Sequence, residues 1–349
     1  MSSYFRPEID RMQGYVPGEQ PRGGSVTKLN TNENPYPPSP RVAEAIAASL
    51  GEPLRRYPDP VGTDFRKAAA RLHGVSPEMI LAGNGSDDLL TILTRAFVGQ
   101  GQLAVAPTPS YILYRTLIEI QGGRFLEVPF DSTWRLDHSR FAHPEARLAY
   151  LANPNSPSGT MLTPDEVSDL ANKLPCPLIV DEAYGDFADL HCIALIADHP
   201  NVIVTRTLSK GYGLAGLRLG YLIARPEIVD GLSKVKDSYN CDLLSLVGAT
   251  AALDDQPYLG TTRALILATR ARLVETMRRR GYTVPDTQAN FAWCTGGPPA
   301  APLYEALKSR GILVRLMRYP GYDDGLRITV GTDEQVDHFL EVHADLTRP

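Results

Sequence analysis

Short apolar runs alternate with longer amphipathic segments through most of this chain of 349 residues. Several of the runs are apolar throughout, which is typical of strands covered on both faces of a sheet. The strand-like runs are MILAGNG (79–85), LAVAPTPSY (103–111), LAYLANP (148–154), LIVDEAY (178–184), VIVTRTLSK (202–210) and LGYLIA (219–224). Helical patterns lie between them at DDLLTILTRAFV (87–98), ILYRTLIEIQGG (112–123) and TPDEVSDLANKL (163–174). In the last of these, Thr163 with Glu166 predicts a capping-box start.

This alternation predicts an α/β fold with a mostly parallel central sheet flanked by helices, and we expect residues 41–250 to form that large domain. The order of elements then changes: helix at 264–281, strand at 290–294, helix at 303–311, strands at 312–316 and 326–331, and a helix from Asp333. Residues 251–349 are therefore expected to form a smaller α+β domain. Residues 1–40, rich in Pro, Gly, Asn and Tyr, are expected to form an extended arm that joins the smaller domain rather than a packed element.

Composition narrows the class of protein. The net charge of −5 is mild and the basic residues are scattered, so we expect no nucleic-acid partner. No window approaches the ~18 consecutive apolar residues of a membrane span, and the first ten residues lack the apolar core of a signal peptide. The four cysteines form no CxxC pair and are expected to be reduced and mostly buried. These features predict a cytoplasmic protein with no membrane partner. His138 with His143, and His191 with His199, match no known ligand spacing, so we expect no metal site.

One stretch carries candidate chemistry, LSKGYGLAGLRLGY (208–221), in which Arg218 follows Lys210 by eight positions. A lysine that is desolvated beside other cations has a lowered pKa and can form a Schiff base with a carbonyl. Asp181 ends another apolar strand, where a buried carboxylate needs a cationic partner such as a protonated pyridine nitrogen. Gly85 and Ser86 begin a helix whose free N–H groups favour a phosphate. Together these residues predict a site for a phosphate-bearing ligand beside a reactive amine.

The chain resembles the fold type I pyridoxal-phosphate-dependent aminotransferases over nearly its whole length, and within them the histidinol-phosphate aminotransferase branch. The motifs that carry the resemblance are YVPGEQP (15–21), KLNTNENPYPPSP (28–40), RYPD (56–59), GNGSDD (83–88), PTPSYILY (107–114), NPNSPSG (153–159), VDEAYGDF (180–187), TLSKGYGLAGLRLGY (207–221) and GLRITVG (325–331). Their order and spacing make a chance match improbable. The resemblance implies pyridoxal 5′-phosphate as cofactor, with a large domain and a smaller α+β domain.

The resemblance also implies roles for individual residues around the cofactor. Lys210 would be the Schiff-base lysine, Asp181 the partner of the pyridine nitrogen, and Tyr184 a hydrogen-bond partner of the ring oxygen O3′. The phosphate would be held by residues of three segments: Gly85, Ser86, Asp87, Thr207, Ser209 and Arg218. Tyr111 would stack on the ring, and Ser156 would face O3′.

Other residues would contact the substrate or a second subunit. Arg327 would grip the substrate α-carboxylate, a task suited to its planar fork. Arg315, Tyr15 and Asn32 are further candidates for contacts to the substrate's distal phosphate or side chain. Tyr57 would reach the phosphate of the cofactor across a dimer interface, which implies a homodimer.

Three positions depart from the family pattern: Ser156 replaces the usual asparagine, Gly211 follows the lysine where alanine is common, and Pro37 replaces a usual glycine. The resemblance implies amino transfer between L-histidinol phosphate and 2-oxoglutarate in histidine biosynthesis. Three alternatives stay open: an aromatic amino-acid aminotransferase, a decarboxylase of phosphorylated amino acids on the same scaffold, and a non-catalytic domain that uses the fold for binding or regulation.

Overall fold

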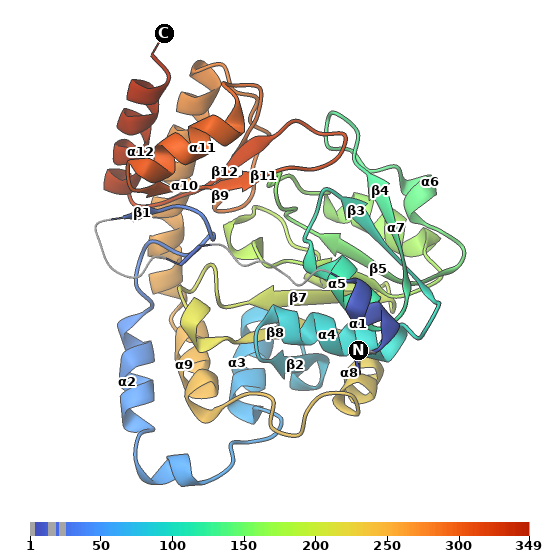
Figure 1. Cartoon of the computed structure of the whole chain (residues 1–349). Coiled ribbons are helices and arrows are strands. Elements are labelled where there is room, and N and C mark those ends of the chain that lie inside the picture. The colour runs from blue at the N-terminus through green and yellow to red at the C-terminus, as the bar shows by residue number, and fades with distance from the viewer. Residues whose placement is uncertain (1–3, 13–18, 21–25, 349) are drawn as a thin grey trace.

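The computed structural model describes residues 4–12, 19–20 and 26–348. Its central feature is a seven-stranded sheet with strand order β2-β8-β7-β6-β5-β3-β4 (Figure 1). The strands are β2 (Ile80–Gly83), β3 (Leu103–Thr108), β4 (Arg124–Pro129), β5 (Ala146–Ala152), β6 (Leu178–Asp181), β7 (Val202–Thr207) and β8 (Gly220–Ile223). Five of them, from β7 to β4, are mutually parallel, which confirms the predicted α/β class and the mostly parallel sheet.

β8 is the exception, because it runs antiparallel to both of its neighbours, β7 and β2. The connection from β7 to β8 contains only a 3-10 helix (Ala215–Leu217), whereas a parallel pair requires a crossover that is usually an α-helix. This short connection between β7 and β8 carries both Lys210 and Arg218 at one end of the sheet. β4 adds an edge strand that its mixed apolar and polar sequence did not predict.

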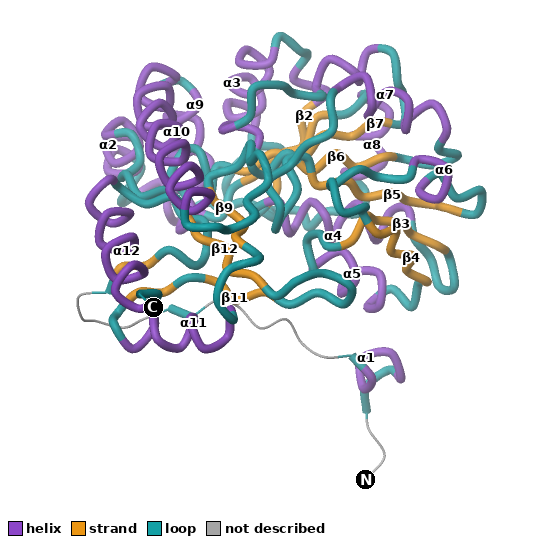
Figure 2. Tube along the Cα trace, turned by 90° about the horizontal axis from the view of Figure 1, so that it is seen from above, coloured by secondary structure: helices purple, strands orange, loops and turns teal. Residues whose placement is uncertain are grey.

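Both faces of this sheet are covered by helices. In β6, the side chains of Leu178 and Val180 pack into the cluster that contains residues of α3, α6, α7 and α9, whereas Ile179 packs into the cluster with α4, α5 and α8. In Figure 2 the strands run between α3 and α7 on one side and α4 and α5 on the other. Burial on both faces explains why the strands read as continuous apolar runs.

The helices of this part of the chain are α2 (Pro40–Ala48), α3 (Thr63–His73), α4 (Ser86–Phe97), α5 (Leu113–Ile120), α6 (His138–Phe141), α7 (Pro164–Lys173), α8 (Pro226–Ser233) and α9 (Leu243–Leu253). α7 begins with the predicted capping box: the Thr163 hydroxyl accepts from the Glu166 backbone N–H, and the Glu166 carboxylate accepts from the N–H of Thr163. Short 3-10 helices lie at Glu52–Arg55, Pro77–Met79, Gly185–Phe187 and Ile193–Ala197.

A second packed unit has its own sheet, with strand order β11-β12-β9, and its own hydrophobic cluster. Its elements are β9 (Phe291–Cys294), β10 (Ile312–Leu313), β11 (Arg315–Met317), β12 (Gly325–Thr329), α10 (Gln256–Arg279), α11 (Ala300–Ser309) and α12 (Asp333–Leu346). The run 312–316, expected to be one strand, is divided between two sheets: β10 pairs with β1, and β11 pairs with β12. The domain division after residues 40 and 250 stays a prediction.

The expectation that the N-terminal arm forms no packed element is wrong. α1 (Pro7–Arg11) contacts α5, and β1 (Thr27–Lys28) pairs in parallel with β10. Leu29, Asn30 and Asn32 are at most 3% exposed. Sequence periodicity could not reveal this because β1 has two residues and is ordered by pairing with a strand nearly 300 positions away.

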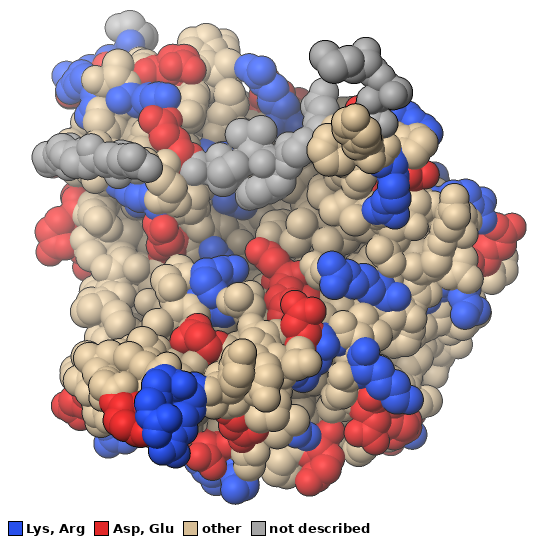
Figure 3. All heavy atoms as spheres, turned by 60° about the horizontal axis from the view of Figure 1, so that its bottom comes forward, with Lys and Arg blue, Asp and Glu red and all other residues tan. Residues whose placement is uncertain are grey.

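The surface carries charges of both signs. On the face shown in Figure 3, acidic and basic side chains are interspersed among uncharged ones. All four cysteines are buried and free, as predicted. Within the described part of the chain, none of the helices combines the length and apolarity needed to cross a bilayer.

Candidate active site

A cavity of about 780 Å³ opens at the carboxyl ends of the parallel strands, where β11, β12 and the arm meet the large sheet. This edge of an α/β sheet is where ligands usually bind. The predicted site residues that line it are Asn32, Ser86, Asp87, Tyr111, Ser156, Asp181, Tyr184, Thr207, Ser209, Lys210, Arg218, Arg315 and Arg327. Residues as far apart in the chain as Asn32 and Arg327 thus line the same cavity.

Lys210 lies just after β7, and its Nζ donates a hydrogen bond to the carbonyl oxygen of Thr31 at 3.0 Å. Burial is the main cause that lowers the pKa of Lys210 to about 8, with Arg327 as a further cause, while Glu33 and Asp87 act in the opposite direction. The uncharged fraction of this amine is therefore larger than for an ordinary lysine and reaches about half near pH 8. An uncharged amine can attack a carbonyl carbon and accept a proton.

Asp181 ends β6 and is 4% exposed. Its Oδ2 accepts from the Tyr114 hydroxyl at 2.8 Å, and its Oδ1 accepts from the Thr205 hydroxyl at 3.1 Å. Burial raises the pKa of Asp181 to about 6, against the lowering effect of these hydrogen bonds. Among the described residues its partners are neutral donors and no Lys or Arg pairs with it, so this carboxylate favours a positively charged ligand atom. Tyr114 and Thr205 were not predicted as site residues, because nothing in their local sequence shows where their hydroxyls point.

The opposite end of the cavity suits an anion. Ser86 begins α4, whose N-terminal N–H groups and dipole favour negative charge. Gly85 precedes it with φ +83°, a backbone conformation that favours glycine, and a Cβ there would lie 2.7 Å from Nη2 of Arg218 and displace that guanidinium. Arg218 Nη1 donates to the Ser209 hydroxyl at 3.2 Å. The Thr207 hydroxyl in turn accepts from the backbone N–H of Ser209 at 3.2 Å.

Asp87 lies between this anion site and the aromatic wall of the cavity. Its Oδ2 is 3.7 Å from Nη2 of Arg218, and its Oδ1 accepts from the hydroxyl of Tyr111 at 3.0 Å. The Tyr111 ring also packs edge to face on Tyr114, with centroids 5.6 Å apart. The Asp87 carboxylate therefore orients both a cationic and an aromatic side chain at the cavity, while its backbone N–H belongs to the free N–H groups at the start of α4.

Two guanidinium groups face the cavity from the second sheet. Arg315 on β11 is the direct cross-strand partner of Arg327 on β12, so both side chains lie on the same face of the sheet. Arg327 donates to the Ser156 hydroxyl at 2.9 Å and to the carbonyl oxygen of Asn30 at 3.3 Å. Its guanidinium also lies 5.3 Å from the centre of the Phe291 ring. These contacts hold Arg327 in place before any substrate binds.

Three predicted residues are placed differently from the rest. Asn32 lines the cavity, but its side-chain amide donates to the Tyr184 hydroxyl oxygen at 2.8 Å. Tyr57 lies on the outer surface, 80% exposed, and stacks on Tyr239 with ring centroids 4.6 Å apart. Tyr15 lies outside the described residues.

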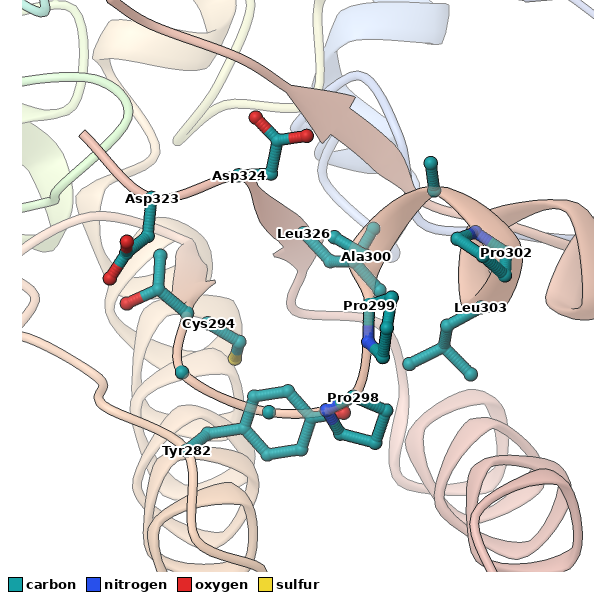
Figure 4. Close-up of a pocket in the computed structure, with 14 residues that line it drawn as sticks. Tyr282, Cys294, Pro298, Pro299, Ala300, Pro302, Leu303, Asp323, Asp324 and Leu326 are labelled. Carbon is teal, nitrogen blue, oxygen red and sulfur yellow. The ribbon is translucent and has the colours of Figure 1, made fainter. Parts of the chain in front are cut away.

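A smaller cavity, of about 370 Å³, lies on the other side of β12 (Figure 4). Leu326 lines it, whereas the next residue, Arg327, lines the larger cavity, as expected for alternate side chains of a strand. Its wall combines the Tyr282 ring and Pro298 with the carboxylates of Asp323 and Asp324. Burial raises the pKa of the Cys294 thiol in this wall, which makes it a poor nucleophile.

The larger cavity fits pyridoxal 5′-phosphate by the chemistry of its side chains. That cofactor needs an amine for its aldehyde carbon, an acidic partner for its ring nitrogen and donors for its phosphate. Lys210 has the lowered pKa of a reactive amine, and Asp181 is a buried carboxylate that pairs with no cation in the part of the chain that the structure describes. The start of α4 and Arg218 form the anion site.

Comparison with known proteins agrees with this chemistry. The profile of the family described as aminotransferase class I and II matches residues 24–342. The histidinol-phosphate aminotransferase of Rhodopirellula baltica is 50% identical over 336 residues, covering 95% of this chain and 93% of that protein. Histidinol-phosphate aminotransferase 1 of Nostoc sp. is 46% identical, with 99% of each chain covered.

Among solved structures, the chain is similar to histidinol-phosphate aminotransferase from Sinorhizobium meliloti in complex with pyridoxal-5′-phosphate. The TM-score is 0.90 at 30% sequence identity, and 99% of both chains is covered. The chain belongs to the class I and II aminotransferase family and is an aminotransferase that depends on pyridoxal phosphate.

Proposed function

We propose that the enzyme transfers the amino group of L-histidinol phosphate to 2-oxoglutarate, giving 3-(imidazol-4-yl)-2-oxopropyl phosphate and L-glutamate, as a cytoplasmic step of histidine biosynthesis. The names of the relatives at 42–50% identity support this choice of donor. The observation that carries it is the pair Arg315 and Arg327, directly opposite each other on β11 and β12.

The chemistry of the donor explains why two arginines matter. L-Histidinol phosphate bears a phosphate ester in the position where an amino acid bears its α-carboxylate. A phosphate monoester carries a charge of about −1.5 to −2 at neutral pH, and guanidinium groups bind it through paired N–H donors. Arg327 would hold the carboxylate of glutamate or the phosphate of the donor, and Arg315 would add the second positive charge for the phosphate.

The residues around Lys210 would carry out the proton transfers. Pyridoxal phosphate, when bound, supplies a carbonyl for amines and a cationic ring that withdraws electrons. Asp181 keeps a proton on the ring nitrogen, because a buried carboxylate is stabilised by a cation beside it. Lys210 would hold the aldehyde carbon of the resting cofactor, and its freed Nζ would accept the α proton of the donor and return it to that same cofactor carbon, C4′. The lowered pKa of Lys210, about 8, suits an amine that both accepts and returns a proton near neutral pH.

The proposed active unit is a homodimer in which Tyr57 completes the partner's cofactor site. Tyr57 is 80% exposed and extends from a surface that also exposes Leu50, Leu54 and Val61, between 43% and 55% each. Large apolar side chains gathered in this way are typical of an interface.

The cross-subunit role of Tyr57 is tested by mixing the Tyr57→Phe protein with the inactive Lys210→Ala protein and allowing their subunits to exchange. In a hybrid dimer one site carries both changes and the other site is intact. The activity of the mixture should therefore exceed the sum of the activities of the two separate variants. No gain in activity after subunit exchange would refute the cross-subunit role.

The donor is tested by single half-reactions. The holoenzyme is mixed with histidinol phosphate, histidine, phenylalanine or tyrosine, and the loss of the lysine-bound absorption band is followed by stopped flow. We expect histidinol phosphate to react with the highest kcat/KM. A much faster reaction with phenylalanine or tyrosine would make the protein an aromatic aminotransferase. Release of carbon dioxide from a phosphorylated amino acid would support the decarboxylase.

A further inference from the structure

We propose that Asn32 is a positioning residue that directs the Tyr184 hydroxyl toward the cofactor. An asparagine at position 156, as in the family pattern, would donate its amide to the ring oxygen O3′. In this chain the amide comes from the arm, where Asn32 donates to the Tyr184 hydroxyl. The inference depends on the cofactor site and not on which amino donor the enzyme uses.

The contacts of Asn32 fix its side chain on every side. It is 1% exposed and has φ +55°, the left-handed region that asparagine adopts more readily than most residues. Its backbone N–H donates to the Thr329 hydroxyl at 3.0 Å, and its backbone carbonyl accepts from Asn290 at 3.1 Å. The Thr329 hydroxyl donates to Oδ1 of Asn32 at 3.0 Å, and Nδ2 donates to the Tyr184 oxygen at 2.8 Å.

This arrangement decides the direction of the Tyr184 proton. With Oδ1 engaged by Thr329, the amide presents its N–H side to Tyr184, and the phenol oxygen acts as acceptor. The hydroxyl hydrogen of Tyr184 is then free to be donated into the cavity. An amide turned by 180° would accept that hydrogen and withdraw it from the ligand. The Thr329 contact therefore protects the one donor that Tyr184 has.

The Ser156 hydroxyl accepts from Arg327 Nη1 at 2.9 Å and is also a hydrogen-bond partner of the Tyr184 hydroxyl. Asn32 is held to β12 through Thr329, so its position does not depend on Ser156. The two residues before Asn32 also contact the site through their carbonyl oxygens: Asn30 accepts from Arg327 at 3.3 Å and Thr31 accepts from Lys210 at 3.0 Å. Residues 30–32 thus bind three side chains of the site, Arg327, Lys210 and Tyr184.

Two charged groups near Tyr184, Arg327 and Asp181, also shift its pKa. Burial is the largest cause and raises the pKa of Tyr184, and the Asp181 carboxylate acts in the same direction. Arg327 and the hydrogen bonds from Asn32 and Ser156 lower it. The ammonium of Lys210 lies 5.9 Å from the centre of the Tyr184 ring. A test must therefore separate the effect of Asn32 from these neighbours.

The variant Asn32→Gly removes the amide while glycine keeps the left-handed backbone and both backbone hydrogen bonds. The readout is the pH midpoint at which the absorption band of the lysine-bound cofactor changes in the holoenzyme. Tyr184 stabilises negative charge on the ring oxygen and so weakens that oxygen's hold on the proton of the adjacent nitrogen. Without Asn32 this effect weakens, and the midpoint should rise by about 0.5 pH unit.

A double-mutant cycle shows whether the effect acts through Tyr184. In the Tyr184→Phe background, Asn32→Gly should leave the midpoint unchanged, because the hydroxyl that it orients is absent. Thr329→Val, which frees the amide to turn, should raise the midpoint in the same direction and serves if Asn32→Gly fails to fold. An unchanged midpoint in both single variants, or an equal shift with and without the Tyr184 hydroxyl, would overturn the proposal. Neither result bears on the donor preference measured in half-reactions.

Discussion

Asp181 should make the apoprotein less stable at neutral pH, because its carboxylate is buried and no described residue supplies a cation to it. Replacing it by asparagine keeps the shape and removes the charge. The side chain is 4% exposed, and burial raises its pKa from 3.8 to about 6. For an acid whose pKa is higher in the folded state, the stabilisation is complete below the unfolded pKa and is lost as pH rises through the folded one.

The magnitude follows from these two pKa values. The cost to wild-type apoprotein is about 1.6 kcal/mol at pH 5 and approaches about 3 kcal/mol at pH 8, for a shift from 3.8 to about 6. Asp181→Asn apoprotein should therefore be the more stable of the two, by a margin that grows by about 1.4 kcal/mol between these pH values. Bound cofactor should reverse the order, because a protonated ring nitrogen stabilises the carboxylate but not the amide.

Urea unfolding of both apoproteins at several pH values between 5 and 8 gives the free energy of unfolding directly. Asp198→Asn, which changes an exposed carboxylate, serves as the control and should show no such growth. A difference between wild type and Asp181→Asn that is independent of pH would refute the reasoning. So would an asparagine variant that is less stable than wild type at pH 8.

Three further changes test other parts of the site. Lys210→Ala should still bind the cofactor but lose transamination by at least roughly a thousandfold, measured in steady-state assays, because no other amine replaces its proton transfers; undiminished turnover would contradict this. Arg218→Gln should weaken cofactor binding by roughly tenfold to a hundredfold in a spectroscopic titration, since charge-assisted hydrogen bonds to phosphate are lost. The control variant Arg71→Gln, which changes an exposed arginine, should bind the cofactor as tightly as wild type. Arg315→Gln should lower kcat/KM for histidinol phosphate by roughly tenfold or more and that for phenylalanine by less, because only the first donor carries a dianion; equal losses would remove Arg315 from phosphate recognition.

The sequence predicts the fold well where local pattern determines it. Continuous apolar runs separated by helical segments require a sheet covered on both faces, and the carboxyl ends of such strands meet at one edge. Asp181 and Lys210 therefore belong to the same cavity even though the chain between them is 28 residues long. The sequence of β8 does not predict its antiparallel direction, because that direction depends on the connection from β7 and not on the strand itself.

Other contributions arise only in three dimensions. Thr31 acts through its backbone carbonyl, for which no side chain gives a signal. Tyr114 contacts Asp181 only because α5 packs on the face of the sheet that Ile179 of β6 also faces. Asn32 was predicted to contact the substrate, whereas its amide faces Tyr184 from a segment that pairing with β10 holds in place. The role of Tyr57 needs a second copy of the chain and stays a prediction.

The central claim, that Lys210 carries the cofactor, can be measured directly. The holoenzyme is reduced with borohydride, digested with trypsin and analysed by mass spectrometry. We expect a phosphopyridoxyl group on Lys210 within the peptide TLSKGYGLAGLR, residues 207–218, which trypsin would leave uncut at the modified lysine. The adduct on another lysine, or no adduct after the absorption band has disappeared, would contradict the account.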